Sequence, residues 1–529
     1  MSVKFRILIF SILFVCFSGA LQSQLWKADN GDGTYKNPVL FADYSDPDVI
    51  RVGDDFYMVA SSFTCMPGIP VLHSKDMINW KIINHVYSAL PLQRYLKPQH
   101  GQGSWAPSIR FHKGKYYVYF CTPQDGLFMA SANNPAEKWE LTHVQDVSHW
   151  EDPCPFWDED GKAYLLRGRV GAGPAILHRM SEDGKKLLDN GVLIYEDWEK
   201  QPTLEGFKFM EKQDGYYYFS APAGGVSTGW QAVFRSKNIY GPYEEKNVLE
   251  MGTTGINGPH QGSFVETQTG EWWFFHFQSR GIYGRVVHLQ PVVWENGWPV
   301  VGADFDGNGV GEPVMNYKKP NVGKIYPVTI PQTSDNFDSN KLGLQWQWNA
   351  APQKKWYSLS ARKGYIRLYA ASSPTLQGNL ISAGNLLLQK LSSPTFSATA
   401  KIELNADLQG DRAGLAIFGN YYTTLFIEKR NDGNYLVLHE GRQEKRNYLP
   451  VELKSLKISQ NSALVRVKIH EDATSSYSYS MDGKNFIPLG EKFRIEPGTW
   501  VGAKVGVFCI SPNINSSKGF ADVDFVTIE

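Results

Sequence analysis

The sequence predicts an all-β protein in which a five-bladed β-propeller is followed by a β-sandwich. Two observations favour many short strands over long helices: aromatic residues make up 14% of the 529 residues, and the chain contains 49 Gly and 29 Pro. A third observation is a repeat of about 50 residues in the N-terminal part, because such periods are typical of propellers and solenoids.

The repeating unit is a β-hairpin. In each unit a short strand leads into a tight turn, and a strand rich in aromatic residues follows the turn. The turn glycines are Gly53, Gly114, Gly161, Gly215 and Gly270. Further strands follow within the units, and a hairpin with two outer strands is one propeller blade. The alternative, one large β-sandwich, would not require this repeat.

A connector and a second domain follow the repeats. Prolines punctuate the connector at Pro313, Pro320, Pro327 and Pro331. Beyond it, polar and apolar residues alternate as in strands that are buried on one face, with Asp482-Gly483 as a predicted turn. The residues expected to face this second core include Val465, Val467, Ile469, Val523 and Phe525. We expect a propeller at residues 21–320, a linker at 321–334 and a β-sandwich at 335–529.

Residues 1–20 have the features of a secretory signal peptide. A basic stretch precedes the apolar run Ile7–Phe17, and small residues suit cleavage after Ala20. A membrane-spanning helix needs about 20 apolar residues, and no later segment has them. The residues before Cys16 are not the small ones that a lipoprotein signal prefers. We therefore expect a secreted or periplasmic protein.

Charge and cysteine content exclude several classes of protein. With 53 basic and 53 acidic residues the chain has no net charge, which argues against nucleic-acid partners and polybasic membrane binding. After cleavage of the signal peptide, the remaining cysteines are Cys65, Cys121, Cys154 and Cys509. They lie too far apart for a zinc site or a disulfide scaffold. One disulfide is possible in an oxidising compartment, and free buried thiols are the simpler expectation.

The residues just before the inner strand of each blade are candidates for a central site. A propeller gathers the starts of these strands around one axis. Seven to ten residues upstream of the turn glycines lie Asp46, Trp105, Asp152, Glu205 and His260, which we interpret as equivalent positions. Each Asp alone, preceding a proline, would be an ordinary turn residue. The shared spacing favours a functional interpretation instead.

Paired carboxylates beside aromatic side chains suit the hydrolysis of glycosides. This reaction needs an acid that protonates the leaving oxygen, a base that activates water and flat surfaces on which a sugar stacks. A third carboxylate near the acid would keep the acid protonated near neutral pH through like-charge repulsion.

Several motifs follow one another in order between about residues 30 and 315. They include Asn37-Pro38-Val39-Leu40, Tyr44-Ser45-Asp46-Pro47-Asp48, Trp105-Ala106-Pro107, Glu151-Asp152-Pro153, Leu204-Glu205-Gly206, Gly258-Pro259-His260-Gln261-Gly262 and Gly284-Arg285. As an ordered set they closely resemble glycoside hydrolase family 43, the β-xylosidases and α-L-arabinofuranosidases. The chain departs from the family after the acid, where Gly206-Phe207 replaces a frequent Gly-Pro.

The resemblance implies an inverting hydrolase and a role for each site residue. Asp46 corresponds to the general base, Glu205 to the general acid and Asp152 to the residue that modulates the pKa of the acid and orients it. Arg285 corresponds to the arginine that contacts sugar hydroxyls, and His260 to the axial histidine, which in some relatives organises the pocket through a bound calcium. Phe63 and Trp105 resemble the walls of the sugar subsite. No cofactor is required, and a structural Ca²⁺ near His260 is the only metal that the resemblance suggests.

The C-terminal module resembles the β-sandwich of the family's exo-acting xylosidases, which helps to close the pocket. We therefore expect an exo-glycosidase that releases terminal β-D-xylose, α-L-arabinofuranose or both from xylan or arabinoxylan oligosaccharides. The sequence leaves the choice of pentose open. The alternative is a non-catalytic carbohydrate-binding propeller, which would need the aromatic walls but not three carboxylates.

Two short motifs suggest other functions and are rejected. Residues 225–229 match the G-x-S-x-G pattern of serine hydrolases, but the alternation of strands and helices that this fold requires is absent, so we interpret them as a loop. The run that begins at Asp304 resembles an EF-hand calcium loop, but Met315 occupies the position of the bidentate glutamate. A surface turn is the expected structure there.

Overall fold

The computed structural model describes residues 25–529 except 374, 376–377, 443–449 and 514–516. The predicted signal peptide, residues 1–20, lies outside the described residues. The helices described are short 3₁₀ turns: η1 (Gln93–Leu96), η2 (Gly281–Tyr283), η3 (Lys354–Trp356) and η4 (Leu380–Ser382). Within the described part of the chain, none of the helices has the length and apolar character needed to span a membrane.

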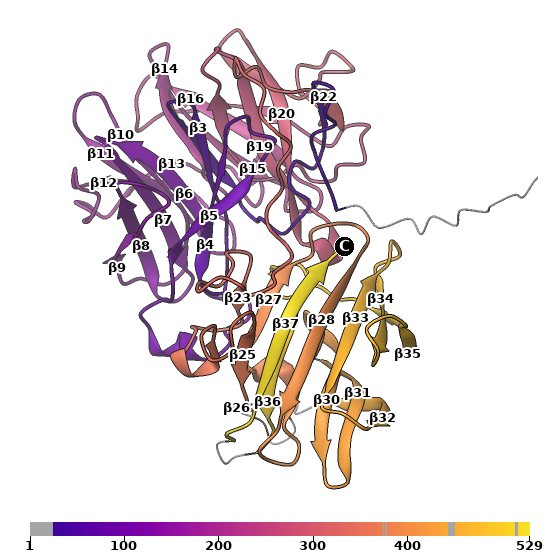
Figure 1. Cartoon of the computed structure of the whole chain (residues 1–529). Coiled ribbons are helices and arrows are strands. Elements are labelled where there is room, and N and C mark those ends of the chain that lie inside the picture. The colour runs from indigo at the N-terminus through magenta and orange to yellow at the C-terminus, as the bar shows by residue number, and fades with distance from the viewer. Residues whose placement is uncertain (1–24, 374, 376–377, 443–449, 514–516) are drawn as a thin grey trace, which may run out of the picture.

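Five antiparallel four-stranded sheets form the five blades of a propeller (Figure 1). The first two blades contain β2 (Asp48–Val52), β3 (Asp55–Val59), β4 (Gly68–Ser74) and β5 (Lys81–Tyr87), then β6 (Trp105–His112), β7 (Lys115–Thr122), β8 (Gly126–Ala132) and β9 (Glu140–Gln145). The third contains β10 (Trp150–Trp157), β11 (Ala163–Arg169), β12 (Ala175–Met180) and β13 (Val192–Tyr195). The last two contain β14 (Phe209–Gln213), β15 (Tyr216–Ala223), β16 (Trp230–Ser236) and β17 (Glu244–Leu249), then β18 (Phe264–Glu266), β19 (Trp272–Ser279), β20 (Arg285–Glu295) and β21 (Trp298–Val301).

The five predicted hairpins are confirmed, since each joins the first two strands of a blade. The turn glycines have positive φ angles between 63° at Gly53 and 87° at Gly270, a conformation that side chains with a Cβ rarely adopt. The aromatic strands after the turns supply the packing between neighbouring blades. Tyr57 of β3, for example, meets Tyr116 of β7 edge to face.

The ring is closed by the segment before the first blade. Every blade consists of consecutive strands, so no blade borrows a strand from the other end of the chain. Instead Leu40 exchanges backbone hydrogen bonds with Val287 of β20, and the Tyr44 N–H donates to the Arg285 carbonyl. A two-stranded sheet of β1 (Thr34–Lys36) and β22 (Asn316–Lys318) reinforces the closure. This pairing brings the residues around Asp46 alongside Arg285.

Two further sheets form the C-terminal β-sandwich (Figure 1). One contains β23 (Gln347–Trp348), β26 (Ala371–Ser372), β27 (Leu386–Lys390), β29 (Arg412–Phe418), β30 (Tyr421–Arg430), β31 (Gly433–Arg442), β32 (Val451–Ile458) and β36 (Lys504–Ser511). The other contains β24 (Tyr357–Ser358), β25 (Ile366–Tyr369), β28 (Phe396–Asn405), β33 (Ser462–Ile469), β34 (Thr474–Ser480), β35 (Ile487–Arg494) and β37 (Phe520–Ile528). The predicted turn at Asp482-Gly483 joins β34 to β35.

One predicted core position of the sandwich is wrong. Val523 is buried as expected, but Phe525 is only partly buried and Val526 takes its place in the core. The pairing of β37 with β28 shifts register at this point, so a bulge reverses the alternation of faces. Asp522, which precedes Val523, is 2% exposed and is paired with Arg367.

All four described cysteines are buried and free: Cys65, Cys121, Cys154 and Cys509. Burial raises the pKa of the Cys509 and Cys121 thiols, which disfavours the reactive thiolate. The expectation of free thiols agrees with this arrangement.

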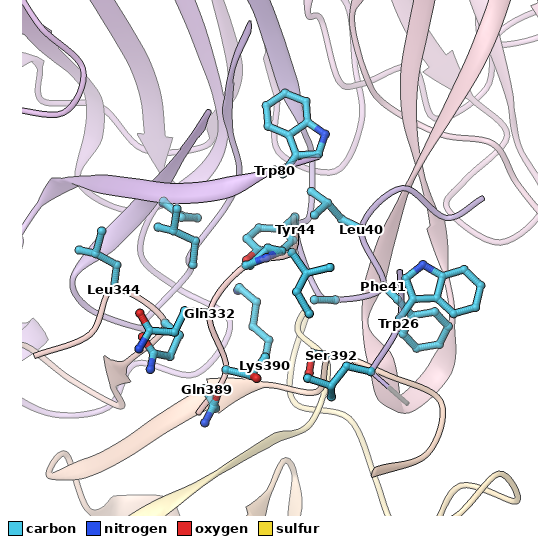
Figure 2. Close-up of a pocket in the computed structure, with 18 of the residues that line it drawn as sticks. Trp26, Leu40, Phe41, Tyr44, Trp80, Gln332, Leu344, Gln389, Lys390 and Ser392 are labelled. Atoms are coloured by element: carbon cyan, nitrogen blue, oxygen red, sulfur yellow. The ribbon is translucent and has the colours of Figure 1, made fainter. Parts of the chain in front are cut away.

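The sandwich packs directly on the propeller. Backbone hydrogen bonds connect Met66 with Trp348 and Ala503 with Ile282. A small cavity of about 60 Å³ lies in this seam, with Trp80 and Tyr44 on the propeller side and Lys390 on the sandwich side (Figure 2). Its lining is mostly apolar and contains none of the predicted site residues, so the chemistry takes place elsewhere.

Candidate active site

A left-handed backbone residue marks the entrance of every blade. The positive φ angles occur at Asp46 (56°), Ala106 (33°), Asp152 (54°), Gly206 (68°) and Gln261 (48°). Such angles strain residues other than glycine, and strain of this kind concentrates at functional sites. The shared conformation therefore defines which positions of the five blades are equivalent.

By this criterion the five residues predicted upstream of the turn glycines fall into two classes. Asp46 and Asp152 are left-handed residues, whereas Trp105, Glu205 and His260 each come one residue before the left-handed residue of their blade. The prediction of one common register was wrong by one position. Counting from the turn glycines missed the offset because the inner strands differ in length, from three residues in β18 to eight in β6 and β10.

A pocket of about 390 Å³ opens at the blade entrances. It brings together all but one of the predicted site residues: Asp46, Phe63, Trp105, Asp152, Glu205 and Arg285. The remaining one, His260, is fully buried and contacts Glu205. Residues from every blade of the propeller thus meet at one place, as the sequence predicts.

Three side chains donate hydrogen bonds to the Asp46 carboxylate. The Ser61 and Ser45 hydroxyls lie 2.5 Å and 2.9 Å from Oδ2, and Arg285 Nη1 lies 3.1 Å from Oδ1. Asp46 is 4% exposed, so these donors replace most of its water. A carboxylate held in this way has a fixed orientation and can accept a proton from a water in the pocket.

Glu205 contacts the buried His260 on one side and the pocket on the other. Its Oε1 is 2.8 Å from Nε2 of His260, while 26% of its side chain remains exposed to the pocket. The next residue, Gly206, donates its backbone N–H to Asp152 Oδ2 at 2.6 Å. One carboxylate oxygen of Glu205 is thus fixed, and the other is free to meet a ligand.

Asp152 and Glu151 add two buried carboxyls beside Glu205. Side-chain oxygens of the three residues all lie within 4.8 Å of one another, and Asp46 is not part of this group. Burial, followed by repulsion from Glu205 and Asp46, raises the pKa of Asp152, although Lys208 opposes the shift. Burial and the charge of Asp152 raise the pKa of Glu151 strongly. The sequence singled out Asp152 but missed Glu151, which stands next to it.

Aromatic rings form walls of the pocket. The Phe63 and Trp105 rings meet edge to face with centroids 6.2 Å apart, and Trp105 meets Trp500 in the same way at 6.4 Å. Trp500 comes from the loop between β35 and β36 of the sandwich, so the second domain completes the pocket. No periodic pattern in the sequence predicts this residue, because its position depends on how the two domains pack.

The loop that carries Trp500 is anchored to the propeller by Asp43. Asp43 Oδ2 accepts the backbone N–H of Gly502 at 3.0 Å, and Oδ1 accepts the backbone N–H of Arg285 at 2.9 Å. Lys504 lies 3.9 Å from the same carboxylate. One buried aspartate therefore ties the sandwich to the arginine that holds Asp46.

The residues around His260 do not form a calcium site made of protein ligands. Its Nδ1 is buried and has no hydrogen-bond partner, but Ca²⁺ prefers several oxygen ligands. Among the described residues, the only three acidic, cysteine or histidine side chains close enough to share a cation are Glu151, Asp152 and Glu205, and this group excludes His260. The calcium near His260 stays a prediction.

The two rejected motifs are loops, as expected. Residues 225–229 follow β15 and form a turn in which the Gly229 N–H donates to the Gly225 carbonyl. Gly225 and Val226 line the pocket, so this loop contributes to its shape. Asp304 caps an exposed turn by accepting the backbone N–H groups of Gly307 and Gly309.

Comparisons with known proteins agree with this geometry. The family model for glycosyl hydrolases family 43 matches residues 35–299, and the model for the β-xylosidase C-terminal concanavalin A-like domain matches residues 334–529. A Xylanibacter ruminicola protein whose name assigns it provisionally to the β-xylosidases is 45% identical over 93% of this chain and 88% of its own length. A β-xylosidase of Formosa agariphila is 34% identical over 96% of this chain and 92% of its own.

More distant relatives share the same architecture. A non-reducing-end α-L-arabinofuranosidase of Bacteroides ovatus is 29% identical over 80% of this chain and 81% of its own length. The crystal structure of a family 43 protein from Bacillus licheniformis superimposes with a TM-score of 0.80 at 26% identity, covering 94% of this chain and 99% of that one. The chain therefore belongs to glycosyl hydrolases family 43 and is a glycoside hydrolase with a β-xylosidase-type sandwich behind its propeller.

Proposed function

We propose that this hydrolase inverts the anomeric carbon and releases single terminal pentoses, β-D-xylose or α-L-arabinofuranose, from xylan or arabinoxylan oligosaccharides. The observation that carries the proposal is that one pocket contains two carboxyls with different partners, and that Asp46 lies outside the group that Glu205 forms with Glu151 and Asp152. Asp46 is held by Arg285 and two serines, and Glu205 by His260 among other acids. A base and an acid on opposite sides of the sugar are what inversion requires.

In the proposed reaction, Glu205 gives its proton to the glycosidic oxygen while the bond from that oxygen to the anomeric carbon breaks. Asp46 takes a proton from the water that attacks the same carbon from the other face. Asp152 remains beside Glu205 and orients it through the Gly206 backbone. Arg285 both orients Asp46 and presents its guanidinium to the pocket, where sugar hydroxyls bind.

The shape of the pocket supports action at chain ends. Trp105 and Trp500 approach from the two domains, and the loops at Ala172 and Val226 line the other walls. A pocket with walls on all these sides receives one terminal sugar, and its aromatic faces offer stacking surfaces. The names of the relatives, β-xylosidases and an α-L-arabinofuranosidase, support pentosides as substrates.

The experiment compares p-nitrophenyl β-D-xylopyranoside with the α-L-arabinofuranoside, using residues 21–529. Asp46→Ala should lose activity on every substrate by roughly 100-fold or more, because no other group activates the water. Glu205→Ala should lose far more on xylobiose than on the aryl glycoside, whose leaving group needs little protonation. Equal losses on both substrates would remove Glu205 from the acid role, and silence on both aryl substrates would favour a binding propeller. Proton NMR of the first sugar released reports inversion directly.

We also propose that the protein acts outside the cytoplasm, secreted or in the periplasm, after cleavage following Ala20. The basic start, the apolar run Ile7–Phe17 and the small residues before the cleavage site support this. N-terminal sequencing of the protein recovered from cell fractions tests it. A mature chain that still begins at Met1 in the cytoplasmic fraction would contradict it.

A further inference from the structure

Glu151 occupies the same place in the third blade as Glu205 does in the fourth. Each comes one residue before the left-handed residue of its blade, Asp152 or Gly206. Neighbouring blades therefore present two glutamates from equivalent positions, and both line the pocket. Side-chain oxygens of Glu151 and Glu205 lie within 4.8 Å of each other.

The surroundings of Glu151 make room for its side chain but leave part of it unpaired. It is 4% exposed, and its Oε1 has no hydrogen-bond partner. The residue opposite on β11 is Gly168, where an added Cβ would lie 3.4 Å from Glu151 Cγ and 3.0 Å from the Phe207 ring. Phe207 replaces the proline that is frequent after the acid, so an apolar ring and a glycine together accommodate this extra carboxyl.

The charged groups that face Glu151 are acidic. Asp152 lies on its own strand, Glu205 on the fourth blade and Asp46 on the first, while the Cys121 thiol approaches from the second. The cations nearby have other partners. Lys208 donates to the Pro107 carbonyl, Arg285 binds Asp46, and Arg167 donates to the Gly168 carbonyl and stacks on Trp150. No ion pair among the described residues includes Glu151. A buried carboxyl in this setting is stabilised by keeping its proton, and burial together with Asp152 raises its pKa accordingly.

We propose that Glu151 is a positioning residue that keeps its proton and donates a hydrogen bond to Glu205 as that residue gives its own proton to the leaving oxygen. Glu205 then becomes a carboxylate, with its Oε1 held by His260 and a side-chain oxygen within 4.8 Å of one of Glu151. The Glu151 O–H stabilises this developing charge without being consumed. The contact is loose in the free enzyme and tightens as charge develops, as is common for catalytic hydrogen bonds. The inference rests on the proposed role of Glu205 as the acid.

Two substitutions separate the hydrogen bond from the shape of the side chain. Glu151→Gln keeps the shape and an N–H donor, so it should retain activity within about threefold on both xylobiose and the aryl xyloside. Glu151→Met keeps a similar volume without a donor, and it should lose about 10- to 100-fold in kcat on xylobiose but less than about threefold on the aryl substrate. If the enzyme prefers arabinose, the corresponding arabinosyl substrates replace xylobiose and the aryl xyloside in both measurements. Thermal unfolding of each variant confirms that it folds, and Glu151→Ala serves as a second donor-free variant.

The outcomes are distinguishable. A glutamine variant as defective as the methionine variant, or donor-free variants with full activity on xylobiose, would overturn the inference. Equal losses of the donor-free variants on both substrates would show a structural role only. Glu205→Ala is measured in parallel. If its loss of activity does not depend on the leaving group, the proposed function fails. If its loss depends on the leaving group but the loss in Glu151→Met does not, only the role of Glu151 is refuted.

Discussion

Gly502→Ala should impair catalysis by pushing the sandwich away from the base side of the pocket. A Cβ at Gly502 would lie 2.7 Å from both the backbone nitrogen of Gly284 and the carbonyl carbon of Tyr283. These are backbone atoms and cannot rotate away, so the contact has to open to about the 3.4 Å at which ordinary van der Waals contact begins. Gly502 also donates the hydrogen bond that reaches Asp43 and, through it, Arg285.

The size of the effect follows from overpacking and from misplacement. Inserting a methyl group into a packed region costs about 1–3 kcal/mol. A shift of this order in the loop of Trp500 misplaces the wall of the pocket and loosens Arg285, and shifts approaching 1 Å cost up to about 100-fold in rate. We expect kcat/KM to fall by about 10- to 100-fold, with a fall in Tm of a few degrees.

The assay is the kcat/KM for the preferred p-nitrophenyl pentoside, with Gly255→Ala as the matched control. An added Cβ at Gly255 meets nothing within 4 Å, and its backbone does not have a positive φ. The control should therefore keep wild-type activity. A Gly502→Ala variant within twofold of the wild type would refute the reasoning that the sandwich positions Arg285.

Two further predictions concern protons and metals. The pKa of Glu151 is raised in the folded chain, first by burial and second by the charge of Asp152. Above the ordinary pKa of 4.5, the folded state therefore binds more protons than the unfolded state. Ionisation of Glu151 thus lowers the stability of the folded chain as the pH rises. Glu151→Gln should then have a higher Tm than the wild type at pH 8, with a gain that shrinks toward pH 4.5; a difference that does not vary with pH would contradict this. Dialysis against EDTA should leave kcat and Tm unchanged, because the described residues around His260 do not form a calcium site made of protein ligands. A loss of activity or a lower Tm that Ca²⁺ restores would instead support the predicted structural calcium near His260.

Local signals in the sequence were sufficient for the blades. A glycine turn followed by an aromatic strand is specified within a few residues, so the hairpins at Gly53 and Gly270 could be predicted without knowledge of the rest of the chain. The gathering of Asp46, Asp152 and Glu205 in one pocket followed from the closure of the ring, because all three stand near the start of an inner strand.

The remaining features depend on geometry that spacing does not encode. A bulge shifts the register of β10 near Glu151, which was not predicted as a site residue. A second bulge shifts the register of β37, so Phe525 was predicted on the wrong face. Trp500 reaches the pocket only because the two domains dock, and residues that meet across an interface have no fixed separation in the sequence. Both kinds of feature are long-range, whereas turn residues and alternation are local.

The two sides of the pocket are supported by different parts of the molecule. On the base side, Asp46 depends on Arg285, whose backbone is held by Asp43 together with the sandwich loop at Gly502. On the acid side, Glu205 is supported within the propeller, by His260 of the fifth blade.

Inversion needs both carboxyls at a suitable separation, with room for a water between them. Docking of the sandwich therefore does more than narrow the pocket around a terminal sugar. In the proposed mechanism it also holds the side from which the water is activated, while the acid side stays in place with the blades. On this proposal, a domain that supplies no carboxyl to the pocket still contributes to the chemical step.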